Sequence, residues 1–147
     1  MPTKRRSRRQ VFTKHDVVRL LDLRLHHLVN FVNRGFLGPS VSRGRRGRGG
    51  ERLYNVCDLV ALRSAQELTR LGLVGQRLRL ICRKIRQIER SGMRRALLVV
   101  THAGEALHVP TGRDVVRLIR HAERPFGHLV LDLDRISRDV RRSTRKR

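Results

Sequence analysis

The segment from Ser42 to Glu51 alternates glycine with arginine, and it constrains the fold more than any other part of the sequence. Each glycine in a helix interior costs about 1 kcal/mol relative to alanine, so this run separates the helical patterns on its two sides. Short apolar pieces flank it, Phe36 and Leu37 before it and Leu53 and Tyr54 after it. We predict that the segment is the tip of a two-stranded hairpin, with an unstructured basic linker as the alternative.

Two short helices are predicted before this hairpin. The first follows Thr13, whose hydroxyl can accept a helical N–H, while Asp16 falls in the positive first turn. After Asp22, apolar residues recur at spacings of three and four, which predicts a second helix ending near Gly35. Two short helices joined by a tight turn make a helix-turn-helix. The apolar positions are Val17, Val18, Leu20 and Leu21 in the first helix, and Leu25, Leu28, Val29 and Val32 in the second.

Two longer helices are predicted after the hairpin. Asn55 and Asp58 provide a second capping signal, and the third helix closes at Leu71 and Gly72. A fourth helix is predicted from about Gln76 to Arg90. Its apolar spacing is typical of a coiled-coil seam or of a helix that faces a partner. The seam consists of Leu78, Ile81, Ile85 and Ile88.

The last third of the chain changes from helical to extended patterning. We predict strands over Ala96–Thr101 and Ala106–Val109, and a helix capped by Thr111 that runs to Ala122. A third strand over His128–Leu133 and a helix over Asp134–Arg142 follow. The predicted fold class is therefore α+β: a winged helix-turn-helix of four helices and a two-stranded wing, followed by a small β-β-α-β-α unit. A unit this small is expected to dock on the first part or to dimerise.

Four regions follow from these patterns. They are a basic arm over residues 1–11, a first folded domain over 12–91, a small αβ dimerisation or partner-binding unit over 92–142, and a basic tail over 143–147. The arm is suited to lying along phosphates, and a solvated tail is the alternative.

The charge balance indicates a polyanionic partner. The chain has 35 Lys and Arg against 12 Asp and Glu, a formal net charge of +23, so nucleic acid is the leading candidate. Aromatic residues make up only 3%, and unpaired bases usually need aromatic platforms, so double-stranded DNA is favoured. We see no signal peptide and no membrane-length stretch, and we expect a cytoplasmic, nucleoid-associated protein without a membrane partner.

The sequence offers little support for catalysis or for bound cofactors. It contains no C-x-x-C or H-x-x-x-H spacing, no phosphate-binding glycine loop and no Ser-His-Asp arrangement. Cys57 and Cys82 fall within apolar helical patterns, where free cysteine acts as a small hydrophobe and a disulfide framework is not expected. Histidines 102, 108, 121 and 128 are interpreted as surface or structural. We predict a non-enzyme with no metal and no cofactor.

The first part of the chain resembles the winged helix-turn-helix of the MerR family of bacterial transcription regulators over about residues 12–88. Helix, turn, wing, R-x-Y strand and L-G turn occur in the family's order. The residues that carry the resemblance are Phe12, Thr13, Asp16, Val17, Leu20, Leu21, Asp22, Leu23, Leu28, Phe31, Arg34, Gly35, Phe36, Leu37, Pro39, Arg52, Leu53, Tyr54, Asp58, Leu59, Leu62, Leu71, Gly72 and Leu73. Val29 and Val32 depart from it, because the family usually has an Arg and a Glu there, and the family's long dimerising coiled coil is absent.

The resemblance implies a homodimer on double-stranded DNA, with the second helix in the major groove and the wing on the flanking backbone. His27 and Asn30 are the candidates for base contact. The candidate DNA-binding residues of the second helix are Arg24, His26, His27, Asn30, Asn33 and Arg34. Those of the wing region are Arg43, Arg45, Arg46, Arg48, Arg52 and Tyr54.

Two other functions fit the same sequence. One is an antitoxin-like interaction protein that binds a protein partner through residues 92–142 and regulates its own gene through DNA binding. The other is an architectural nucleic-acid-binding protein without sequence preference, or an RNA-binding, ribosome-associated protein, because arginine neutralises phosphates whatever the bases.

Overall fold

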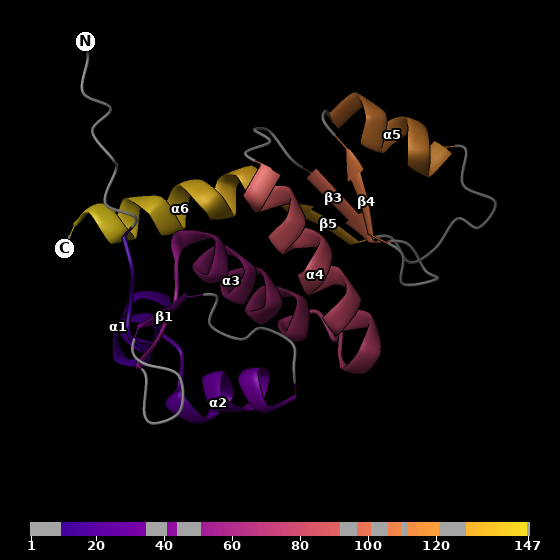
Figure 1. Ribbon diagram of the computed structural model, residues 1–147. Helices are drawn as coiled ribbons and strands as arrows, with labels where there is room; N and C mark the ends of the chain where they lie inside the picture. Colours follow the sequence, from indigo (N-terminus) through magenta and orange to yellow (C-terminus); the bar gives the residue numbers. More distant parts are fainter. Residues whose placement is uncertain are drawn as a thin grey trace, which may run out of the picture.

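The computed structural model describes residues 10–34, 41–43, 51–91, 97–100, 106–109, 112–120 and 129–146 (Figure 1). Helices and two antiparallel sheets are both present, which confirms the α+β class. The elements are α1 (Lys14–Leu21), α2 (Leu25–Asn33), β1 (Val41–Arg43), β2 (Glu51–Leu53), α3 (Val56–Arg70), α4 (Gly75–Ser91), β3 (Leu97–Val100), β4 (Ala106–Val109), α5 (Gly112–Arg120), β5 (Leu129–Asp132) and α6 (Leu133–Arg145).

The capping signals predicted for α1 and α3 are confirmed, and the predicted cap Thr111 lies outside the described residues. The Thr13 hydroxyl accepts a hydrogen bond from the Asp16 N–H at 3.2 Å, and the Asp16 carboxylate accepts one from the Thr13 N–H at 3.0 Å. Asn55 and Asp58 form the same reciprocal pair before α3, with both bonds at 2.9 Å. Because each cap satisfies helical N–H groups that have no partner within the helix, these residues fix where α1 and α3 begin.

A two-stranded sheet pairs β1 with β2, and its first strand differs from the prediction. Val41 lies opposite Leu53 and Arg43 lies opposite Glu51, so the residue pair Ser42 and Arg43 belongs to a strand and not to the hairpin tip. The predicted flanking pair at 36–37 and the tip at 44–50 lie outside the described residues.

The second sheet is three-stranded, in the order β4-β3-β5. Leu98 and Val100 on the central strand β3 share the core with α4 and α6, while Val99 between them is also fully buried on the opposite face. Helix α5 contacts β3 and β4, and Val130 on the edge strand β5 stays 45% exposed. The sheet therefore lies between the helical body and α5 (Figure 1).

Helix α3 lies at the centre of the core, and α4 and α6 pack against it. The predicted seam of α4 is covered by this chain itself: its four apolar residues are at most 3% exposed and lie in the same buried cluster as Leu98, Leu131, Leu133 and Val140. The interpretation of this seam as a coiled coil or a partner-facing surface was therefore wrong. The core continues without a break across the boundary predicted after residue 91.

Helix α6 extends beyond its predicted end at Arg142. The Asp132 carboxylate accepts a hydrogen bond from the Arg135 N–H at 3.0 Å, which caps the helix start. Val140 and Thr144 are each 4% exposed, and α6 packs on α3 and α1. This burial stabilises residues 143–145 in the helix, whereas the sequence pattern predicts the start of a basic tail there. None of the helices in the described ranges is both long and apolar enough to cross a bilayer.

Candidate nucleic-acid interface

Helix α2 is attached to the body by few side chains and presents most of its surface to solvent. Leu28 is its single buried residue, at 1% exposure, and Phe31 and Val32 are half-buried. All the polar positions predicted for DNA contact on this helix and at its two ends are exposed. They are Arg24, His26, His27, Asn30, Asn33 and Arg34.

Contacts at both ends hold α2 in place. The turn before it passes through Asp22, which has a left-handed backbone at φ 50°, and the Leu23 N–H donates to the Val18 carbonyl at 3.0 Å. At the other end, the guanidinium of Arg79 on α4 donates to the carbonyl of Arg34. Because the last carbonyls of a helix have no partner within it, this bond both caps α2 and fixes its angle to α4.

The amino-terminal end of α2 is suited to an anion. Arg24 occupies the N-cap without a capping hydrogen bond from its side chain, and the first turn of α2 holds no acidic residue. The helix dipole places partial positive charge at this end, where N–H groups can donate to phosphate. The exposed His26 and His27 rings meet edge to face at 4.2 Å between centroids.

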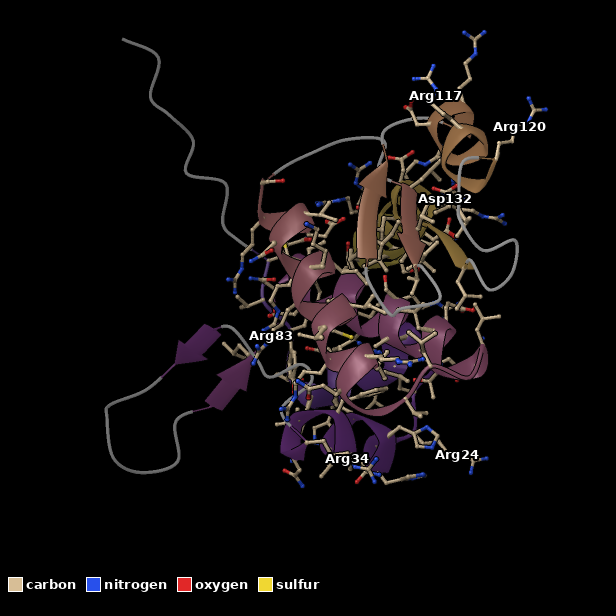
Figure 2. All side chains as sticks on the ribbon, turned by 90° about the vertical axis from the view of Figure 1, so that its right-hand side faces the viewer. Arg24, Arg34, Arg83, Arg117, Arg120 and Asp132 are labelled. Carbon is tan, nitrogen blue, oxygen red and sulfur yellow. The ribbon has the colours of Figure 1, made fainter. Side chains whose placement is uncertain are left out.

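The basic groups gather at more than one place on the molecule (Figure 2). Arg24 and Arg34 lie at the end formed by α2, and the β1–β2 pair projects from the body near Arg83. Arg117 and Arg120 of α5 lie at the opposite end. The helix predicted to read DNA and the strands of the predicted wing therefore belong to the same part of the molecule.

The predicted wing residues do not all lie in the same kind of environment. Arg43 and Arg52 are in paired strands, and Arg45, Arg46 and Arg48 lie outside the described residues. The Tyr54 side chain is 4% exposed, and its backbone exchanges two 2.8 Å hydrogen bonds with Phe12. The Tyr54 ring belongs to the core, because this bridge draws the end of β2 against the start of the folded chain.

A cleft of about 430 Å³ adjoins α2, and it includes residues that the sequence analysis missed. Gln66, Thr69 and Arg70 at the carboxyl end of α3 line it together with His27 and Asn30. Periodicity assigns these α3 residues to a polar face, but it does not show that this face turns toward α2. The Leu71–Gly72 turn was the available signal, since it marks where α3 ends.

Two ion pairs and the two cysteine thiols outside this interface have structural roles. The Asp58 carboxylate, 1% exposed, lies 3.1 Å from the Arg86 guanidinium, and Glu89 lies 3.6 Å from Arg141. Burial raises the pKa of Cys82 to about 12 and also raises the pKa of Cys57, so both thiols stay protonated at neutral pH. Over the described ranges, no group of three or more His, Cys, Asp or Glu side chains could hold a metal ion.

Comparison with family models and with curated proteins gives no family for this chain. No protein-family model matches the chain, and a search of curated proteins finds no match.

Proposed function

We propose that this protein is a sequence-specific, double-stranded DNA-binding transcription regulator that acts as a dimer and uses a winged helix-turn-helix similar to that of the MerR family. The exposed face of α2 carries the proposal. A helix anchored by one buried leucine leaves its amide, imidazole and guanidinium groups available to a ligand.

The chemistry of α2 fits base recognition in the major groove. An asparagine such as Asn30 can pair with adenine through two hydrogen bonds, and Arg24 can donate to guanine or to phosphate. Leu25 and Val29 are 42% and 43% exposed on the same short helix. In the major groove these apolar groups can contact the methyl group of thymine.

The surrounding basic groups would supply affinity without sequence preference. The β1–β2 wing carries Arg43 and Arg52, and Arg70 adds a cation at the end of α3. Such contacts release counterions, so the logarithm of affinity falls by about 0.9 per phosphate contact for each decade of salt. The wing and α3 then position the protein, and α2 reads the sequence.

The unit formed by β3, β4, α5, β5 and α6 is proposed to serve dimerisation or partner binding. Since the seam of α4 is already buried, the two copies of a dimer must meet through another surface. An operator with two-fold symmetry is the expected target, because a symmetric dimer reads two inverted half-sites.

The first test is enrichment of bound fragments from a random duplex library at near-physiological salt, with competitor RNA present. We expect an inverted repeat, and its half-site spacing would give the dimer geometry. Recovery of unselected duplex would contradict the proposal and favour an architectural protein. Stoichiometric co-purification of a small protein partner, with no enriched sequence, would favour the antitoxin-like function.

A paired substitution tests the role of α2. His27→Ala with Asn30→Ala should remove the preference for operator over random duplex, a loss of about 1–3 kcal/mol per base contact, and leave weak binding intact. His15→Ala with Gln87→Ala, two exposed polar positions on α1 and α4, is the matched control and should keep the preference. Equal loss of affinity for both duplexes in the α2 variant would show that α2 does not read bases.

A further inference from the structure

The cleft beside α2 has an apolar wall that contact with DNA backbone does not require. It lies between α2, the carboxyl end of α3 and the start of α4. Leu23 and Leu78 are buried in its wall and Phe31 is half-buried, whereas Val74 stands 67% exposed at its edge. A phosphate group gains nothing from apolar surface, so these side chains indicate a ligand with a hydrophobic body.

The polar part of the cleft is predominantly cationic. Among the described residues, three arginines, Arg24, Arg34 and Arg70, line it, against one acidic residue, Asp22. Arg70 is paired with Glu67 at 3.3 Å, but the Arg70 side chain is 61% exposed. An exposed pair of this kind contributes little, so Arg70 can turn to a bound anion at small cost.

We propose that this cleft binds a small organic anion, a carboxylate carried on an aromatic or branched apolar body. The apolar wall would take the body, and the guanidinium groups would take the carboxylate in charge-assisted hydrogen bonds. The volume of about 430 Å³ lies within the range of small-molecule sites, roughly 300 to 1,000 Å³.

Occupation of the cleft would compete with DNA. Arg24, His27, Asn30 and Arg34 line the cleft and also form the exposed face of α2, so one set of side chains serves both ligands. This second step rests on the proposed function, whereas binding of the anion does not. The ligand is then an inducer that releases the regulator from its operator.

The test is an amide chemical-shift titration by NMR with naphthoate as the probe and naphthalenemethanol as its neutral counterpart. We expect a dissociation constant on the order of 1 mM or tighter for naphthoate, and about tenfold weaker binding of the alcohol. The shifts should be confined to α2, the end of α3 and the start of α4. Shifts spread over the arginines of the whole surface, or equal affinities for acid and alcohol, would overturn the proposal.

Two matched variants locate the site. Val74→Glu puts a carboxylate at the edge of the cleft and should weaken naphthoate binding about tenfold or more. Val130→Glu makes the same change at an exposed valine on β5, away from the cleft, and should leave binding unchanged. Equal affinities in the two variants would overturn the assignment, and the dispersed NMR spectrum of each variant reports that it is folded.

A competition arm separates this inference from the proposed function. Naphthoate should displace the enriched duplex from the wild-type protein at concentrations that saturate the cleft. Saturable naphthoate binding in a protein that binds no duplex would support the site and contradict the regulator. Duplex binding that saturating naphthoate leaves unchanged would contradict the shared face and its role as an inducer site.

Discussion

Replacing Arg86 by methionine should destabilise the protein strongly, because it leaves the Asp58 carboxylate buried without its counter-charge. Asp58 is 1% exposed and lies 3.1 Å from the Arg86 guanidinium. Removing one partner of a buried ion pair typically costs about 3–5 kcal/mol. Methionine keeps most of the aliphatic stem, so the loss reports the charge more than the packing.

The local geometry places the expected loss at the low end of that range. Asp58 keeps the hydrogen bond that it accepts from the Asn55 N–H at 2.9 Å, and the Arg86 side chain is already 21% exposed. We therefore expect a loss of about 3 kcal/mol in the free energy of unfolding. For a chain of this length, that corresponds to a decrease in Tm of roughly 10 °C.

The assay is urea and thermal unfolding followed by circular dichroism, with Arg90→Met as the control because Arg90 is exposed one turn further along α4. The control should lose less than about 0.5 kcal/mol, as surface substitutions usually do. Adding Asp58→Asn to Arg86→Met should recover a large part of the loss, because no charge then remains buried. A double variant that is no more stable than Arg86→Met alone would show that the buried Asp58 charge is not the cause of the loss.

Two further predictions concern buried titratable groups. Burial raises the pKa of Glu89 above its ordinary value of 4.5, with Arg141 opposing the rise and Asp134 adding to it. The native state then holds this proton more tightly than the unfolded chain, so Glu89 lowers the stability as pH rises from about 4.5 through the raised pKa. Glu89→Gln should flatten this fall in urea unfolding at a series of pH values, and a slope identical to wild type would contradict it. Because the pKa of Cys82 is raised to about 12, the Cys82 thiol should react with a disulfide reagent at pH 8 only after unfolding, whereas rapid modification of the native protein at Cys82 would show that it is accessible.

Local signals in the sequence were sufficient where the chemistry is itself local. Thr13 with Asp16, and Asn55 with Asp58, each satisfy N–H groups within one helical turn, so the starts of α1 and α3 were predictable without any tertiary information. The polar side of α2 was predictable from the spacing of its residues, but Leu25 and Val29, which the same spacing assigns to the apolar face, are 42% and 43% exposed.

The sequence did not predict which part of the chain covers an apolar surface. The spacing of Leu78, Ile81, Ile85 and Ile88 shows an apolar stripe, but periodicity is the same whether a second copy or the same chain buries it. Here α3 packs on it, within a buried cluster that also includes Leu98, Leu131, Leu133 and Val140. The cleft beside α2 was missed for the same reason, since Arg70 and Val74 meet α2 only once α3 and α4 are packed.

The continuous core has a consequence for how this chain can evolve. Proteins built from two separately folded modules can exchange one of them by recombination, because each module keeps its own core. Here Leu98, Leu131, Leu133 and Val140 share one buried cluster with α3 and α4. A crossover after Ser91 would expose apolar surface that is buried in the shared core. We therefore expect the segments before and after Ser91 to be inherited together and to change by matched substitutions in this core.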